Sequence, residues 1–255
     1  MDEQPRRLIY QVAVGEVPPF YQTCIDSVAR YATRIGADHR VETVPILKIR
    51  PLNSQRSANA LRLGYLPIYE KENAFDYLGE YAQVLILDAD IFVKESAPDI
   101  FAESVAPFAG VLERDMPLTL VYADKVRKHS HGQFDLLTDV DWDWNEKGAA
   151  YYNMGLMLLH ESVRAYLEPT AKQFIRRPEF ERFVNGEGHW KWSTDQTLLN
   201  YWLKRDHVPC ANLDWRWNAL YSAVQSVDSA HFVHFFLAAK QMPGSIERTI
   251  AALSG

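Results

Sequence analysis

Short apolar runs alternate with amphipathic stretches through the first part of the chain. Residues 8–14, 41–46 and 83–87 are rich in Val, Ile and Leu and are bounded by polar or turn-forming residues, which predicts three strands. Between them, apolar residues recur at helical spacing over residues 20–35 and 58–69, which predicts two helices. Strands that are apolar on both faces and alternate with helices are typical of a parallel sheet covered by helices on both sides.

The pattern becomes mixed after residue 105. Further strands are predicted at residues 105–112, 118–122, 151–159, 208–211 and 231–236. Further helices are predicted at residues 162–176, 193–204 and 246–253. The second of these helices opens with S-T-D-Q, which resembles a capping box with Ser193 as N-cap and Gln196 at N3. The sequence has no internal repeat and no clear linker, so we expect one domain over residues 1–255 with two lobes, about 1–110 and about 111–255.

Two carboxylates end the third predicted strand, in the stretch V-L-I-L-D-A-D. Ligands of parallel sheets bind beyond the carboxyl ends of the strands, and Asp88 and Asp90 lie at that end. Residues two apart in a strand face the same side, so the two carboxylates would repel each other unless a cation lies between them. A hard divalent cation is one such partner. The alternative is that one aspartate caps a turn and the other meets a lysine.

The segment H-F-V-H-F-F-L-A-A-K holds the next group of polar side chains. The imidazole of His234 would complete a metal site with the two aspartates, and Lys240 could meet an anionic group bound to that metal. The alternative for His234 is a hydrogen-bonded core histidine. In Y-Y-N-M-G-L, Asn153 and Gly155 interrupt an apolar strand, which indicates either a close approach of a ligand or a β-bulge.

Composition restricts the kind of protein. Apolar residues make up 47% and charged residues 24% of the chain, which is typical of a globular domain. A net charge of -6 argues against a nucleic-acid partner, which would select a basic face. The two cysteines, Cys24 and Cys210, are too few for a disulfide framework and indicate a reducing compartment. No apolar run approaches the length of a membrane span or a signal peptide, so we expect a cytoplasmic protein, with peripheral membrane contact left open.

Four motifs, in their order, resemble the nucleotide-sugar-dependent glycosyltransferases of the GT-A fold, most closely family 8. They are D-A-D at 88–90, N-M-G at 153–155, D-Q-T-L-L-N at 195–200 and H-F-F-L-A-A-K at 234–240. The resemblance covers most of the chain. It implies an α/β fold with a mixed, mainly parallel sheet flanked by helices, a nucleotide lobe in the first half and a smaller acceptor-side lobe in the second.

The resemblance also implies roles for individual residues. It implies that Asp88, Asp90 and His234 hold Mn²⁺ or Mg²⁺, and that the catalytic groups near the sugar and the acceptor are Asn153, Asp195 and Gln196. The donor would be bound by Asp88, Ala89, Gly155, Arg62 and Lys240. For Asp195, a carboxylate favoured by the first turn of a helix is the alternative. The family's nucleoside-binding motif is poorly matched, and the residues that remain as candidates for it are Glu16, Phe20 and Tyr21.

By the same resemblance, the reaction is transfer of a hexose-type sugar from a nucleoside diphosphate sugar such as a UDP-sugar. The acceptor would be a saccharide or another hydroxyl compound, and the anomeric configuration would be retained. Leu237 stands where the family has glycine, so a degenerate nucleotide-sugar binding module is the alternative. A haloacid-dehalogenase-like phosphatase is a further alternative, although that family expects Val or Thr where this chain has Phe92.

The tryptophans suggest a place for the acceptor. All seven lie after residue 140, six of them in W-D-W, W-K-W and W-R-W. Flat aromatic rings suit the faces of sugars, and alternate residues of an extended segment share one side. We therefore expect pairs such as Trp190 and Trp192 to line an acceptor groove, with core packing as the alternative.

Overall fold

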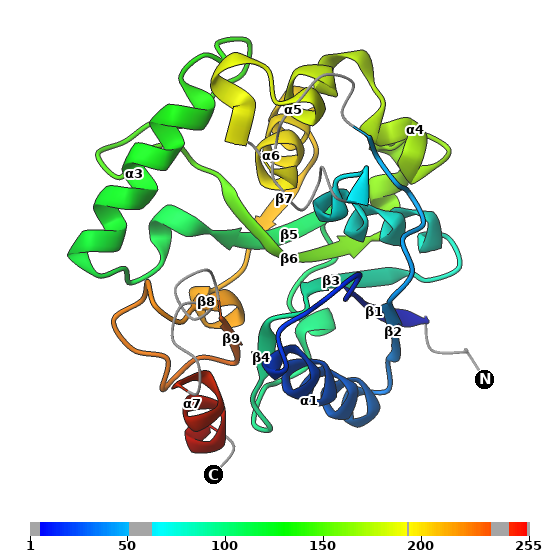
Figure 1. Cartoon of the computed structure of the whole chain (residues 1–255), viewed down its shortest axis with the longest axis vertical. Helices are drawn as coiled ribbons and strands as arrows, with labels where there is room; N and C mark the ends of the chain where they lie inside the picture. Colours follow the sequence, from blue (N-terminus) through cyan, green and yellow to red (C-terminus); the bar gives the residue numbers. More distant parts are fainter. Residues whose placement is uncertain (1–5, 51–62, 193, 236–244, 254–255) are drawn as a thin grey trace.

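The computed structural model of the chain describes residues 6–50, 63–192, 194–235 and 245–253. A six-stranded sheet with the order β2-β1-β3-β6-β5-β7 crosses the middle of the molecule (Figure 1). Its strands are β1 (Arg7–Val12), β2 (Asp38–Glu42), β3 (Gln83–Asp88), β5 (Phe108–Leu112), β6 (Tyr152–His160) and β7 (Cys210–Asn212). Among these strands β6 alone runs antiparallel to both of its neighbours. The predicted α/β fold with a mainly parallel sheet is confirmed.

A second, three-stranded sheet consists of β4 (Ile91–Val93), β9 (Phe232–His234) and β8 (Ala219–Leu220). Strand β4 follows β3 after a two-residue turn and pairs antiparallel with β9. In this register Ile91 lies opposite His234, and the amide of Phe235 donates to the carbonyl of Asp90 at 3.0 Å. The small sheet therefore brings β9, from the last part of the chain, to the carboxyl end of β3.

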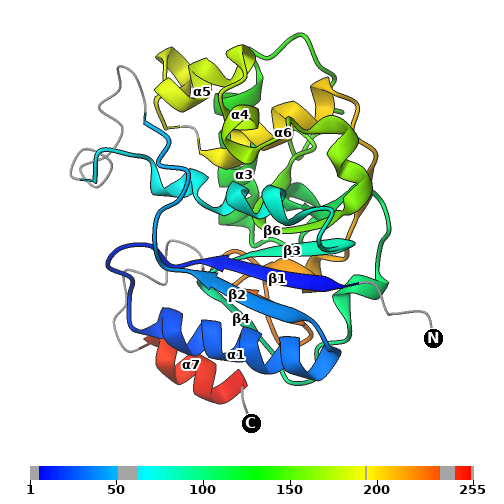
Figure 2. The ribbon, with the colours of Figure 1, turned by 90° about the vertical axis from the view of Figure 1, so that its right-hand side faces the viewer.

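Helices cover both faces of the large sheet (Figure 2). On one face lie α1 (Phe20–Ile35) and α7 (Ser245–Leu253), together with the small sheet. On the other face lie α3 (Leu120–Phe134), α4 (Ala171–Ile175), α5 (Glu181–Asn185) and α6 (Asp195–Arg205). Short 3₁₀ helices connect these elements: η1 (Pro67–Tyr69), η2 (Lys71–Tyr77), η3 (Ile100–Ala102), η4 (Glu113–Asp115), η5 (Glu161–Tyr166), η6 (Pro178–Phe180), η7 (Gly188–Trp192) and η8 (Trp215–Asn218). A pocket lies at the carboxyl ends of β1 and β3.

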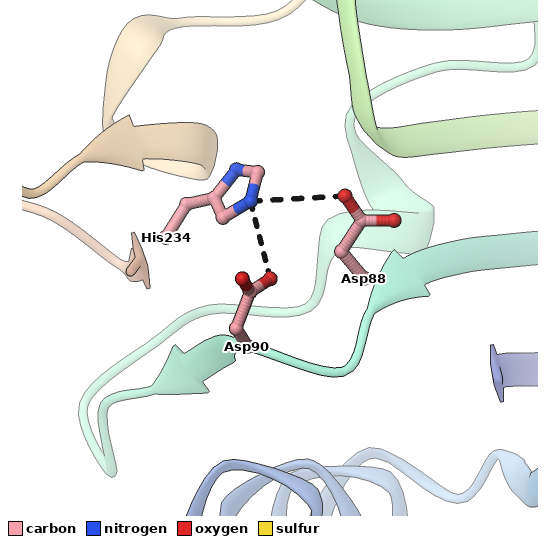
Figure 3. A group of neighbouring side chains, drawn as sticks. All are labelled: Asp88, Asp90 and His234. Carbon is pink, nitrogen blue, oxygen red and sulfur yellow. Dashed lines mark ion pairs between the residues drawn. The ribbon is translucent and has the colours of Figure 1, made fainter. Parts of the chain in front are cut away.

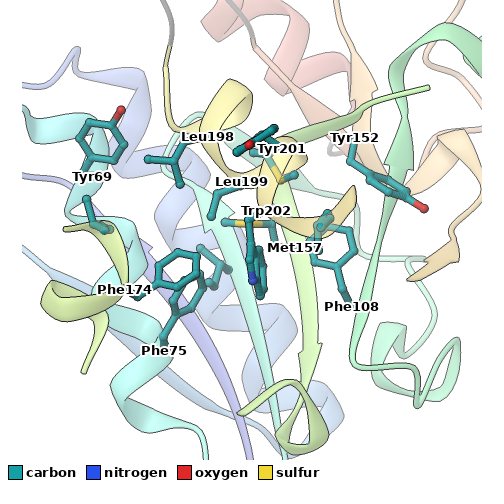
Figure 4. Close-up of a cluster of buried hydrophobic side chains, with 14 of the residues drawn as sticks. Tyr69, Phe75, Phe108, Tyr152, Met157, Phe174, Leu198, Leu199, Tyr201 and Trp202 are labelled. Carbon is teal, nitrogen blue, oxygen red and sulfur yellow. The ribbon is translucent and has the colours of Figure 1, made fainter. Parts of the chain in front are cut away.

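Each face of the large sheet has its own hydrophobic core. In β3, Val84 and Ile86 pack on the side of α4 and α6, whereas Leu85 and Leu87 pack on the side of α1. The first core is rich in aromatic rings, among them Phe75, Phe174 and Trp202 (Figure 4). The ring of Phe174 lies edge-on to Phe75 and to Trp202, with centroid distances of 5.4 and 5.0 Å. A strand buried on both faces cannot alternate apolar and polar residues, which accounts for the apolar runs of β3 and β6.

Some predicted elements differ from the structure. The strand expected at 41–46 lies earlier in the chain, since β2 spans Asp38–Glu42. The strand expected at 118–122 is wrong, because helix α3 begins at Leu120. Leu120 and Val121 are 91% and 65% exposed, so their apolar character does not report burial. The helix instead faces the core through Val126, Ser130, Gln133 and Phe134, where two polar residues weaken the hydrophobic period. The long helix expected at 162–176 divides into η5 and α4.

Local chemistry accounts for the boundaries that moved. Pro169 precedes Thr170, whose side chain accepts from the amide of Gln173 and starts α4. At α6 the N-cap is Thr194, which accepts from the amide of Gln196, rather than Ser193, which lies outside the described residues. The first five residues of the helix predicted at 58–69 likewise lie outside them, and its last three residues form the short 3₁₀ helix η1.

Candidate active site

Three ligand groups meet beyond the carboxyl end of β3: Asp88 ends β3, Asp90 lies in the turn between β3 and β4, and His234 ends β9 (Figure 3). The Nε2 atom of His234 lies 3.2 Å from Oδ1 of Asp90 and 3.7 Å from Oδ2 of Asp88. One ligand atom from each residue lies within 4.8 Å of the others, which suits a single divalent ion. The register of β4 against β9 produces this arrangement, because it places His234 opposite Ile91, the residue that directly follows Asp90. Two carboxylates and one imidazole can thus hold a metal ion here.

The cluster opens into a pocket of about 410 Å³ at the ends of β1 and β3. Asp90 and His234 are buried, whereas the side chain of Asp88 is 35% exposed and faces the pocket. The polar side chains lining the pocket come from Glu16, Tyr21, Lys71, Asp88, Asp90 and Asp195. The hydroxyl of Tyr21 lies 3.3 Å from Oδ2 of Asp90 and donates to it, and burial together with Asp90 raises the pKa of this phenol, so it stays a donor.

Of the three residues considered for nucleoside binding, two line this pocket and one lies in the core. Glu16 and Tyr21 line the pocket, whereas Phe20 is 5% exposed and belongs to the core beside α1. Ala89 also lines the pocket between the two aspartates. Arg62 and Lys240, which were expected to bind the donor, and Leu237 lie outside the described residues.

A buried lysine that the sequence analysis missed joins two of the predicted site residues. The Nζ atom of Lys71 lies 3.0 Å from Oδ1 of Asp88 and 2.7 Å from Oδ2 of Asp195. It also donates to the carbonyl of Met154 at 2.6 Å. Burial lowers the pKa of Lys71, but Asp195 and Asp88 raise it by more, so the ammonium form is held. The alternative that one aspartate meets a lysine therefore applies to Asp88, alongside its place in the metal cluster.

Two further carboxyl groups are buried beside this lysine. Asp195 is the first residue of α6 and is 3% exposed. Burial raises the pKa of Asp195, while the nearby Lys71 opposes that rise. Glu72 is fully buried, and burial followed by the charge of Asp195 raises the pKa of Glu72 well above its usual range. The site thus gathers more carboxyl groups than cations, and Glu72 is the one that favours its protonated form.

Asn153 and Gln196 converge on a glutamate that the sequence analysis also missed. The Nδ2 group of Asn153 donates to Oε2 of Glu113 at 3.2 Å, and Nε2 of Gln196 donates to the same oxygen at 3.5 Å. Burial raises the pKa of Glu113, and the hydrogen bond from Asn153 lowers it. Glu113 directly follows β5, so its place after the strand predicted at 105–112 was the available signal. The carboxyl ends of β3 and β5 therefore share one polar cluster.

Gly155 is explained by a close approach of His234. A Cβ atom at position 155 would lie 2.3 Å from Cε1 and 2.8 Å from Nδ1 of His234. These distances are shorter than any relaxed contact, so only glycine leaves room for the imidazole. The sequence left a close approach or a β-bulge open at this position. The close approach is made by a metal-ligand candidate of the same chain, and the pairing of β6 with β5 also shifts its register between Asn153 and Leu158.

Several of the tryptophans pack in or against the core instead of lining a groove. Trp190 is half-buried, packs edge-on against Phe183 with a centroid distance of 5.4 Å and donates to the carbonyl of Gln133 at 3.1 Å. Trp142 and Trp217 are at most 2% exposed, so each lies in the core while its partner in the W-x-W pair does not. The expectation is wrong for the pairs at 142–144 and 215–217, because in each pair one ring is buried and the other is not. It stays untested for Trp190 and Trp192, since the side chain of Trp192 lies outside the described part of the structure.

Comparisons with known proteins place these observations in a family. Residues 25–240 match the family model described as Glycosyl transferase family 8. The chain is similar in structure to a glycosyltransferase involved in the glycosylation of the major capsid of PBCV-1, with a TM-score of 0.52, 13% identity and 98% of each chain covered. It is also similar to mouse xyloside xylosyltransferase 1, with a TM-score of 0.53, 13% identity and coverage of 92% of this chain and 98% of that chain. At 13% identity, these two similarities show that the chain shares its fold with both proteins.

A search of curated protein sequences finds no match to the chain. Among the described residues, no helix has the length and hydropathy that crossing a membrane requires. The family match and the shared fold confirm the resemblance on which the expectation of a GT-A fold rests.

Proposed function

Since this chain belongs to glycosyl transferase family 8 and is a glycosyltransferase, we propose that it moves a hexose-type sugar from a UDP-sugar to a saccharide or another glycoconjugate hydroxyl. The observation that carries this proposal is the cluster of Asp88, Asp90 and His234 at the mouth of the pocket. An imidazole among the ligands favours Mn²⁺ over Mg²⁺. When bound, the ion would neutralise charge on the donor diphosphate as the anomeric bond breaks.

The chain's own residues would orient the donor. Asp88 and Asp90 present carboxylates from the end of β3, and Lys71 holds Asp88 in place through its ion pair. Asn153 already accepts hydrogen bonds from Gly155 and Asn218 and donates one to Glu113. One N–H of Asn153 therefore remains for a sugar hydroxyl. Gln196 keeps one donor and one acceptor position by the same count, since it accepts from Met154 and donates to Glu113.

Retention of configuration follows from a front-face attack in this proposal. Asp195 is engaged by Lys71 at 2.7 Å, which lowers its reactivity as a covalent nucleophile. The leaving phosphate would instead assist removal of the acceptor proton. The linkage of the product, determined by NMR, tests this step, and an inverted linkage would rule it out.

We assign the nucleotide lobe to residues 1–110 and the acceptor lobe to residues 111–255 as part of the same proposal. Strands of both lobes join one sheet, since β3 pairs with β6. A cytoplasmic location stays a prediction, based on Cys24 and Cys210, which are both free thiols.

The test is isothermal titration of UDP and GDP into the protein with and without Mn²⁺, repeated on Asp90→Ala and on Asp26→Ala. Asp26 is exposed on α1 and lies outside the pocket, so it is the matched control. We expect Mn²⁺-dependent UDP binding in the wild type and in the control, and its loss in Asp90→Ala. Binding that is unaffected by Asp90→Ala would contradict the proposed metal site. Turnover of a UDP-sugar separates the enzyme from a module that only binds nucleotide.

A further inference from the structure

A chain of side-chain amides leads away from His234 on the side opposite the aspartates. The Nδ1 atom of His234 lies 3.0 Å from Oδ1 of Asn218, and Nδ2 of Asn218 lies 2.9 Å from Oδ1 of Asn153. Asn153 and Asn218 are 3% and 0% exposed, and His234 is 2% exposed. Facing polar atoms in so buried a place must be matched as donor and acceptor, so the direction of each hydrogen bond in this chain of amides can be derived from its neighbours.

The assignment of donors and acceptors begins at a backbone N–H group, which can only donate. The N–H of Gly155 donates to Oδ1 of Asn153 at 3.1 Å, so this atom of the Asn153 side chain is its oxygen. The other end of the same amide faces Oε2 of Glu113, which also receives the amide group of Gln196. Gln196 is oriented in the same way, because its Oε1 accepts from the N–H of Met154 at 3.2 Å. Two backbone donors therefore determine how both amides are turned.

The next step follows from the first. Since Oδ1 of Asn153 is an acceptor, the atom of Asn218 that faces it is the NH₂ group, and the atom of Asn218 that faces His234 is the carbonyl oxygen. A carbonyl oxygen accepts only, so Nδ1 of His234 carries a proton and donates it. The remaining ring nitrogen, Nε2, is the one directed toward Asp90 and Asp88.

We propose that Asn218 is a positioning residue that keeps the proton of His234 on Nδ1 and thereby directs the Nε2 lone pair to the metal. This inference rests on the proposed function, because the orientation of His234 has a purpose only if Asp88, Asp90 and His234 bind an ion. Histidines that bind metals through one nitrogen are commonly oriented by a hydrogen bond from the other. The relay Gly155–Asn153–Asn218 supplies the acceptor of that hydrogen bond: Asn218 ends η8, and it is oriented by Asn153 of β6, the strand on which the imidazole packs.

The first experiment reads the proton directly and needs no metal. Protein labelled with ¹⁵N in histidine is examined by long-range ¹H–¹⁵N correlation in the presence of EDTA, and the His234→Gln spectrum assigns the resonance. We expect a bonded proton on Nδ1 of His234 in the wild type and in Asn218→Asp, because a carboxylate oxygen still accepts there. In Asn218→Leu the preference for Nδ1 should be lost. An unprotonated Nδ1 in the wild type would overturn the proposal.

The second experiment measures Mn²⁺ affinity, with free Mn²⁺ followed by electron paramagnetic resonance. Loss of such an outer hydrogen bond typically costs about 10–100-fold in metal affinity, which we expect for Asn218→Leu. Asn218→Asp should retain more of the affinity than Asn218→Leu. Asn185→Leu is the matched control, since Asn185, at the end of α5, is also buried but its amide meets Glu187, away from the cluster.

The histidine spectrum and the Mn²⁺ affinity distinguish failure of the positioning role from failure of the metal site. Unchanged Mn²⁺ affinity in a folded Asn218→Leu variant overturns the positioning role. If Asn218→Leu does not fold, the wild-type spectrum and Asn218→Asp still decide the tautomer. If the wild type binds no Mn²⁺ with or without UDP, the proposed metal site fails and the purpose of the relay fails with it, while the ring spectrum still reports the direction of the hydrogen bond.

Discussion

The imidazole of His234 lies against the backbone of Gly155, so closely that a Cβ there would come within 2.3 Å of the ring. The two residues belong to different sheets, since Gly155 is in β6 and His234 ends β9. Their contact sets the distance between the large sheet and the small one at the metal cluster. The N-x-G motif therefore supports the metal-ligand candidates without being one of them. Gly155 leaves room for the imidazole of His234, and its amide donates to Asn153.

Gly155→Ala should weaken Mn²⁺ binding by about tenfold or more without replacing any ligand, because the imidazole must move away from the aspartates. Gly132→Ala is the control: Gly132 lies in α3, and a Cβ there would meet nothing within 4 Å. Mn²⁺ titration of both variants checks the prediction. Equal affinities would show that His234 is not held by this contact.

Lys71→Met should lower the free energy of unfolding by about 3–5 kcal/mol, because it leaves the buried carboxylate of Asp195 without its cation. Lys204→Met removes an ion pair with the exposed Asp143 and should cost at most about 1 kcal/mol. Urea unfolding of the two variants measures both values. Similar losses for the two lysines would mean that the Lys71 pair gains nothing from its burial.

Glu72→Gln should change how stability depends on pH. Burial raises the pKa of Glu72 above its unfolded value of about 4.3, so between these two pKa values the folded protein holds a proton that the unfolded chain releases. The free energy of unfolding of the wild type therefore falls as pH rises through this window, and a neutral glutamine removes that contribution. The stability of the variant relative to the wild type should rise from about pH 5 to about pH 8 in EDTA. A constant difference across this range would indicate that Glu72 is ionised when folded.

Asn200→Ala should lower the free energy of unfolding by about 3 kcal/mol, because buried backbone groups lose their partners. Its side chain accepts from the N–H of Tyr152 at 2.7 Å and donates to the carbonyls of Tyr152 and Gln196 at 2.9 and 2.8 Å. These bonds join α6 to β6. Asn145→Ala, which alters an exposed turn, is the control, and urea unfolding of both tests whether Asn200 has this role.

The first and third strands and the first helix could be predicted because their patterns are strong. Helix α1 buries Cys24, Val28 and Tyr31 at helical spacing and ends at Gly36, whose φ of 67° favours glycine. Helix α3 was missed since its first apolar residues point to solvent and its buried positions include Ser130 and Gln133. The reversed direction of β6 could not be predicted, because a strand buried on both faces reads the same in either direction.

By itself the sequence determined the family, the strand that ends in Asp88 and Asp90, and the motifs around Asn153, Asp195 and His234, because these residues interrupt apolar patterns that are local. The tertiary structure decided which polar groups meet them. Lys71 and Asn218 stand in segments without a distinctive pattern, and Glu113 is marked only by its place after a strand. All three gain their roles from partners on other elements. Buried charges and amides have to be satisfied in three dimensions, and that requirement leaves no periodic signal along the chain.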